Sequence, residues 1–113
     1  MRSETRPEMV EMDVVYATRR YAVNIDICEN DGVYEWERVE IPAGKWGYAG
    51  VVDALVQFKY PIDKMQAVIN NYLLEPENEE FVTAFNEMQA WRKEAKEIAK
   101  EALLYDINST EEI

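Results

Sequence analysis

The stretch Glu75–Tyr105, EPENEEFVTAFNEMQAWRKEAKEIAKEALLY, is the longest periodic segment of the chain and decides the fold. Its apolar side chains recur at alternating steps of three and four residues, which places them on one stripe of an α-helix. The members of this stripe are Phe81, Ala84, Met88, Trp91, Ala95, Ile98, Ala102 and Tyr105. Pro76 suits a first helical turn, and the glutamates that follow it favour the positive end of the helix dipole. We therefore predict a helix over about residues 76–105.

The stripe on this helix has two interpretations. Small and large side chains alternate along it, as in a coiled-coil seam through which two copies of the chain would associate. Alternatively, the helix covers the core of its own domain. Phe85 and Ala99 widen the stripe beyond a two-position seam, which favours the second interpretation.

The first half of the chain has the period of β-strands. Tyr21–Cys28 alternates apolar and small or polar residues, which is typical of a strand buried on one face. The pair Asp31–Gly32 then precedes Val33–Ile41, and an Asp-Gly pair between two strand patterns predicts a hairpin. Val14–Ala17 is rich in strand formers and suggests a third strand, whereas Thr18–Arg20 either turns the chain or continues that strand.

Two further helices are predicted between the hairpin and the long helix. Residues 48–59 carry apolar side chains at helical spacing, and Pro61 begins a second segment that ends before Pro76. The apolar face of the second helix consists of Ile62, Met65, Ile69, Tyr72 and Leu73. We expect an α+β fold with a small antiparallel sheet of two or three strands (hairpin about 21–41), followed by helices at about 48–59, 61–74 and 76–105. A flexible arm (1–11) and a frayed tail (107–113) would flank one domain (12–106).

Composition excludes several function classes. The net charge of −11 lacks the basic footprint needed to bind a nucleic-acid backbone directly. The chain has no histidine and one cysteine, Cys28, and its two serines, Ser3 and Ser109, lie in the predicted tails, so the usual nucleophiles, bases and zinc ligands are missing. We expect no enzymatic activity, no cofactor and no metal. No run of 18 apolar residues and no apolar leader is present, so we expect no membrane segment and a cytoplasmic location.

Aromatic residues are the candidate binding residues. Tyrosine and tryptophan are enriched at protein interfaces, although they also fill small cores. The candidates for a protein interface are Tyr34, Trp36, Trp46, Tyr48 and Trp91. For Tyr34 and Trp36 core and interface remain equally open, whereas Trp46 and Trp91 favour the core.

The segments KYPIDKMQAVINNYLL (Lys59–Leu74) and MQAWRKEAKEIA (Met88–Ala99) resemble small uncharacterised proteins encoded in phages and prophages of gut bacteria. The resemblance extends over about residues 20–103 and implies no catalytic residues. It implies a structural or assembly protein of the tail or neck region, which acts through protein–protein contacts and is associated with the virion.

Acidity supports an alternative function. Residues 75–113 carry four basic and eleven acidic side chains. An acidic protein of this kind can mimic DNA and inhibit a host nuclease or another nucleic-acid-binding protein. Against mimicry, Arg92, Lys93, Lys96 and Lys100 interrupt the acids of the long helix.

Overall fold

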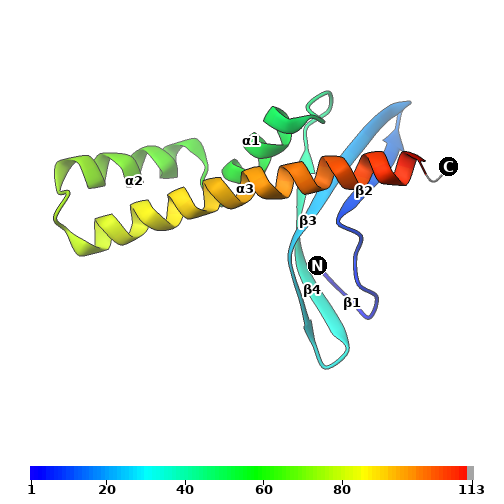
Figure 1. Ribbon diagram of the computed structural model, residues 1–113, viewed down its shortest axis with the longest axis horizontal. Helices are drawn as coiled ribbons and strands as arrows, with labels where there is room; N and C mark the ends of the chain where they lie inside the picture. The colour runs from blue at the N-terminus through cyan, green and yellow to red at the C-terminus, as the bar shows by residue number, and fades with distance from the viewer. Residues whose placement is uncertain (112–113) are drawn as a thin grey trace.

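The structure is a computed structural model, which describes the backbone of residues 1–111 and the side chains of residues 1–105. An antiparallel sheet precedes three helices, which confirms the α+β class (Figure 1). The strands are β1 (Arg2–Ser3), β2 (Val10–Val15), β3 (Thr18–Asn30) and β4 (Val33–Ile41). The helices are α1 (Tyr48–Lys59), α2 (Ile62–Leu74) and α3 (Glu79–Glu111).

The sheet has four strands in the order β1-β4-β3-β2, whereas two or three were expected. The additional strand is β1, which lies in the N-terminal segment 1–11, for which the sequence predicted no regular structure. β2 overlaps the third strand suggested at Val14–Ala17. Arg2 and Ser3 pair with Glu35 and Tyr34 of β4, and β2 begins at Val10. A strand of two residues is too short to show an alternating pattern in the sequence. Such a strand is recognised only by its pairing with a neighbouring strand, which here is β4.

Two tight turns connect the long strands. The predicted turn at Asp31–Gly32 is confirmed, because both residues have the positive φ angles (53° and 79°) that favour Asp-Gly pairs in hairpins. The sequence left open a turn at Thr18–Arg20, but these residues begin β3, and the turn between β2 and β3 lies at Tyr16 and Ala17, with φ angles of 50° and 63°. Neither residue type favours this conformation, so the sequence there contains no turn signal.

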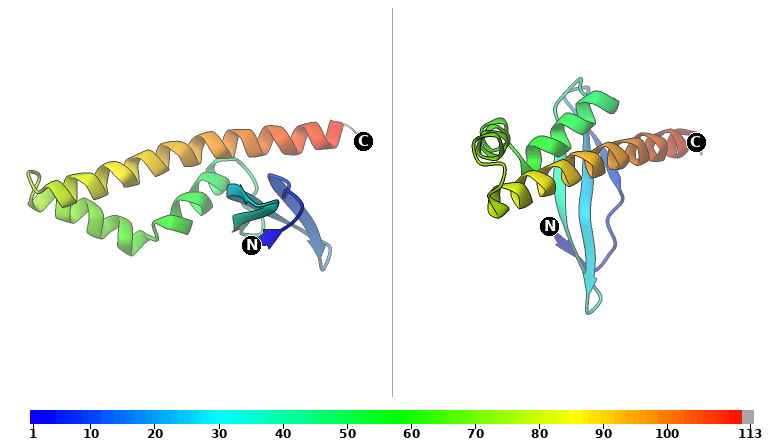
Figure 2. Two further views of the ribbon diagram at one scale, coloured as in Figure 1. Left: turned by 90° about the horizontal axis from the view of Figure 1, so that it is seen from below. Right: turned by 60° about the vertical axis from the view of Figure 1, so that its left-hand side comes forward.

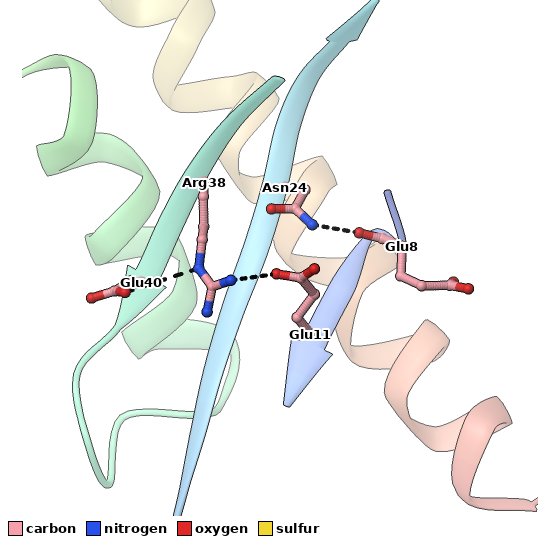
Figure 3. A network of polar contacts seen from close by, with 5 residues as sticks. All are labelled: Glu8, Glu11, Asn24, Arg38 and Glu40. Atoms are coloured by element: carbon pink, nitrogen blue, oxygen red, sulfur yellow. Dashed lines mark hydrogen bonds and ion pairs between the residues drawn. The ribbon is translucent and has the colours of Figure 1, made fainter. Parts of the chain in front are cut away.

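The sequence predicted that Tyr21–Cys28 is buried on one face only. In the structure, the chain between β1 and β2 covers the other, outer face of β3. The side chain of Asn24 donates a hydrogen bond to the Glu8 carbonyl oxygen at 2.7 Å (Figure 3). Arg38 of β4 pairs with Glu11 of β2 at 2.6 Å across the same face. Consequently Ala22 and Asn24 on this face are buried, as Val23 and Ile25 are on the opposite face.

Helices α1 and α3 cover the other face of the sheet and form the core with it. All eight residues of the predicted stripe on α3 are buried or half-buried, and those from Trp91 to Tyr105 pack in the chain's own core. The helix begins at Glu79 and not near residue 76, because the side chain of Asn78 accepts hydrogen bonds from the backbone N–H groups of Glu80 and Phe81. It also continues to Glu111, past the predicted end at 105, since apolar periodicity reports the packed part of a helix and not its whole length. Residues 112–113 of the predicted tail lie outside the described residues.

Helix α2 returns along the first half of α3 and not over the sheet. We call α2 together with residues 79–90 the helical hairpin. Figures 1 and 2 show that this hairpin projects to one side of the sheet and of α1. Tyr72 of α2 stacks on Phe85 of α3, with ring centres 4.3 Å apart. The hairpin therefore carries a small apolar contact of its own, away from the main core.

Candidate functional site

A hollow of about 900 Å³ lies where the chain passes from β4 into α1. Its walls are the end of β4, the loop 42–47 and the first turns of α1. Gly50 is required here, because a Cβ atom at this position would overlap the Lys45 carbonyl oxygen. Two predicted interface residues, Trp46 and Tyr48, line the hollow.

The two aromatic residues of this hollow have different environments. Trp46 is half-buried and stacks on Tyr21 with ring centres 4.3 Å apart and planes 6° apart, so it belongs to the end of the sheet. Tyr48, at the start of α1, is 43% exposed. Among the polar lining residues, Gln57 donates a hydrogen bond to Asp53 at 2.8 Å. Phe58, which also lines the hollow, is 42% exposed, so the hollow offers an open surface with two exposed aromatic rings.

Tyr34 and Trp36 lie away from this hollow. Tyr34 is near the start of β4, and the loop 42–47 follows the end of that strand. The seven residue-to-residue steps from Tyr34 to Ile41 span about 23 Å in an extended strand. Trp36 lies opposite the irregularity between Ile25 and Cys28 in β3 and is only 9% exposed. The candidate aromatic residues consequently do not form one surface.

Trp91 lies in the core between α3 and α1. It is 5% exposed, and its indole N–H donates a hydrogen bond to the Leu55 carbonyl oxygen at 3.0 Å. The ammonium group of Lys59 lies 4.0 Å from the centre of its ring. Trp91 therefore joins two helices and is covered by this chain itself.

The helical hairpin exposes apolar residues that the sequence assigned to a packed face. Every residue of α2 is described, and none of the thirteen is buried. Met65, Ile69 and Tyr72 are half-buried, whereas Ile62 and Leu73 are 55% and 68% exposed. The apolar face predicted for α2 is wider than a single neighbouring helix can cover. This width was the feature of the sequence that could have indicated exposed apolar residues on α2.

The β2–β3 turn is the second exposed apolar region. Tyr16 is 98% exposed, and Val14 and Val15 beside it are 57% and 41% exposed. The only feature of the sequence that indicated this exposed region was the run of strand formers at Val14–Ala17, for which no pairing strand was evident. Exposed apolar residues thus lie mainly at the projections of the fold and not at the predicted aromatic cluster.

Comparison with known proteins gives no match: no family model, no curated protein and no solved structure matches the chain. Within the described residues, no three Cys, Asp or Glu side chains are grouped so that they could hold a metal ion. Among the helices that are described, none is long and apolar enough to cross a membrane.

Proposed function

We propose that this chain is a non-enzymatic protein-binding component that acts through the outer face of its helical hairpin. The observation that supports this most strongly is the apolar stripe left partly uncovered on α2. Ile62, Ile69 and Leu73 are separated by seven and four residues, so they share one side of the helix. We call these three residues the α2 stripe.

Burial of the α2 stripe against a partner protein would contribute favourable binding free energy. Transfer of one large aliphatic side chain out of water stabilises a contact by about 1.5–3 kcal/mol. Single exposed apolar residues are ordinary, but contiguous apolar patches mark interaction surfaces. Ile62 and Leu73 are both more than half exposed and lie on the same projecting helix. A partner that covers them would therefore gain binding free energy without reorganisation of the sheet domain.

The charge around the α2 stripe indicates the chemistry of the partner. Residues 62–90 carry six acidic side chains (Asp63, Glu75, Glu77, Glu79, Glu80 and Glu87) and one basic side chain, Lys64. A complementary surface is an apolar groove with basic side chains at its rim, in which a helix is bound through residues spaced by a helical period. We infer a partner protein of this kind.

The sequence resemblance supports a context for this partner. Residues 20–103 resemble small prophage-encoded proteins, and such proteins often lie among genes for tail and neck components. We therefore propose that the partner is a virion or assembly protein of a phage. The chain would act in the cytoplasm during particle assembly or remain associated with the particle.

DNA mimicry is the alternative use of the same acidic surface. A mimic presents carboxylates to a basic cleft, so its binding weakens steeply as salt screens the charges. Binding through the α2 stripe also buries apolar surface, so salt weakens only the contribution of the charged rim and part of the affinity remains at moderate salt. The salt dependence of binding therefore separates the two functions.

The test is affinity capture with matched serine substitutions. The tagged chain is expressed in cells that encode it, a resident prophage is induced, and bound proteins are identified by mass spectrometry at low and moderate salt. Leu73→Ser should reduce capture of the specific partner by at least about tenfold, which is the loss of roughly 1.4 kcal/mol. The control is Leu104→Ser, because Leu104 is 60% exposed on the other half of α3 and lies outside the helical hairpin.

Each outcome of this capture has a defined meaning. A virion protein that is retained at moderate salt and lost with Leu73→Ser supports the proposal. Capture that is equal for both serine variants excludes the α2 stripe as the binding surface. A basic nucleic-acid-binding protein that is released as salt rises would overturn the proposal in favour of mimicry.

A further inference from the structure

The two ends of the molecule are complementary in charge. The fold measures 54 × 37 × 24 Å, with the α2–α3 connection at one end of the long axis and the β2–β3 turn near the other (Figure 1). We call residues 13–20 the ribbon tip and residues 74–80 the helical tip. Because both tips are projections of the same chain, each copy presents both surfaces at once.

The ribbon tip is basic and apolar. Thr18, Arg19 and Arg20 extend beyond the last β3–β4 pair, Tyr21 with Ile41, so in the described sheet they pair with β2 alone. Arg19 and Arg20 are exposed, and Asp13 is the single acid of this segment. In a chain of net charge −11, this tip carries a positive charge beside the fully exposed ring of Tyr16.

The helical tip is acidic and apolar. It contains four glutamates and no basic residue, and Leu74 at its start is 79% exposed. A shallow hollow of about 460 Å³ lies at this tip, lined by Leu74, Glu75, Pro76, Glu77 and Asn78. Hydrogen bonds from the backbone N–H groups of Glu80 and Phe81 to the side chain of Asn78 hold the connection in place. The glutamates and the exposed Leu74 side chain are therefore presented in a defined arrangement.

The turn at the ribbon tip presents the ring of Tyr16 to solvent. Tyr16 and Ala17 are the two residues of a two-residue hairpin connection, which favours positive φ angles at both positions. A non-glycine residue in this left-handed region is disfavoured by contact between its Cβ atom and the backbone. The pairing of β2 with β3 therefore holds Tyr16 at the end of the tip, where its side chain is exposed.

We propose that the ribbon tip of one copy docks on the helical tip of a second copy, head to tail. Tyr16 enters the hollow beside Leu74 and Pro76, and Arg19 and Arg20 face Glu75 and Glu77. The contact joins two different surfaces, so it leaves one free surface of each kind and propagates into a ring or a filament. It uses none of the residues of the α2 stripe, so it stands or fails independently of the proposed function.

A charge exchange tests this contact with the purified chain. The first variant is Arg19→Glu with Arg20→Glu, and the second is Glu75→Lys with Glu77→Lys. Analytical ultracentrifugation at low salt should show that the wild-type mass rises above 13.2 kDa with protein concentration and that added salt reverses the rise. Each variant alone should remain monomeric, because its exchanged side chains then face unchanged side chains of the same sign across the contact.

The equimolar mixture of the two variants is the decisive sample. The glutamates introduced at positions 19 and 20 of the first variant face the lysines introduced at positions 75 and 77 of the second, and the unchanged tips also complement each other, so association should return. Tyr16→Ala should weaken wild-type association by at least about tenfold. Tyr48→Ala is its control, since Tyr48 is an exposed tyrosine outside both tips.

Three results would overturn the head-to-tail contact. The first is a wild-type chain that stays monomeric at every concentration and salt. The second is self-association that persists when Glu75 and Glu77 are both lysine, because the helical tip would then have no part in it. The third is a mixture of the two charge variants that remains monomeric. Far-ultraviolet circular dichroism of each variant verifies that the fold is retained.

Discussion

The ammonium nitrogen of Lys59 lies 4.0 Å from the centre of the Trp91 ring, on the side of α3 that meets the end of α1. The same nitrogen lies 3.0 Å from a carboxylate oxygen of Asp26. Asp26 has a φ angle of 53° and belongs to the irregular part of β3, where its pairing with β4 shifts. One lysine therefore connects the sheet, α1 and α3 at the point where the helical hairpin leaves the domain.

Replacement of Lys59 by methionine keeps most of the side-chain volume and removes both charged contacts. Cation–π contacts contribute about 0.5–2 kcal/mol, and partly exposed ion pairs contribute about 0–1 kcal/mol. We expect Lys59→Met to lower the free energy of unfolding by about 1 kcal/mol, measured by urea denaturation. Lys64→Met is the control, because the ammonium group of Lys64 lies farther, 4.8 Å, from the Tyr60 ring. Equal effects of the two substitutions would contradict the role given to Lys59.

Trp36→Ala should destabilise the fold strongly. Trp36 is 9% exposed, and its backbone N–H and carbonyl groups are hydrogen-bonded to Met1. Removal of a buried tryptophan side chain costs about 3–5 kcal/mol. The midpoint of urea unfolding, followed by circular dichroism, measures this loss. Tyr34→Ala, at a half-buried position in the same strand, should cost less. A Trp36→Ala chain of unchanged stability would instead identify Trp36 as an interface residue.

Ala17→Gly should stabilise the protein. The φ angle of 63° at Ala17 is accessible to glycine without the penalty of about 1–2 kcal/mol that an L-residue pays. The greater flexibility of glycine in the unfolded chain offsets part of this gain. We expect a net increase of about 0.5–1 kcal/mol in the free energy of unfolding.

Gly32→Ala is the matched change in the opposite direction. Gly32 has a φ angle of 79°, and an added Cβ atom would meet no atom within 4 Å, so only backbone strain changes. This variant should therefore lose about 1 kcal/mol in thermal or urea unfolding. A destabilised Ala17→Gly chain would contradict the assignment of strain to the β2–β3 turn.

Gly50→Ala should disturb the start of α1. An added Cβ atom would overlap the Lys45 carbonyl oxygen, which is part of the backbone and is not free to rotate away. Overpacking of this kind costs about 1–3 kcal/mol. Gly47→Ala is the control, because no atom lies within 4 Å of its added Cβ atom. Thermal melts of the two alanine variants measure the difference, and indistinguishable melts would exclude the close approach at Gly50.

Most of the secondary structure was predictable because it follows local rules. The Asp31–Gly32 pair predicted a hairpin, and the spacing of apolar residues predicted the three helices. The predicted helix start at Pro76 was wrong, since the side chain of Asn78 caps α3 two residues later. The turn at Tyr16–Ala17 escaped prediction, because its conformation is imposed by the pairing of β2 with β3 and opposes the preference of both residues.

The candidate binding surfaces were less predictable than the helices. Trp36, Trp46 and Trp91 were candidates by residue type, but all three lie buried or half-buried against other parts of the chain. Ile62 and Leu73 were assigned to a packed face by their spacing, and yet both are exposed. Spacing identifies a face of a helix, whereas burial depends on whether another element covers that face.

By itself, the sequence determined the α+β class, the central hairpin and the stripe by which α3 covers the core. These features depend on the periods of the helix and the strand and on the conformational preferences of single residues. Only the tertiary structure decided that the segment 4–9 covers the outer face of β3, that α2 projects away from the sheet, and that the basic and acidic tips lie at opposite ends. These features depend on contacts between segments far apart in the chain, and such contacts leave no periodic signal in the sequence.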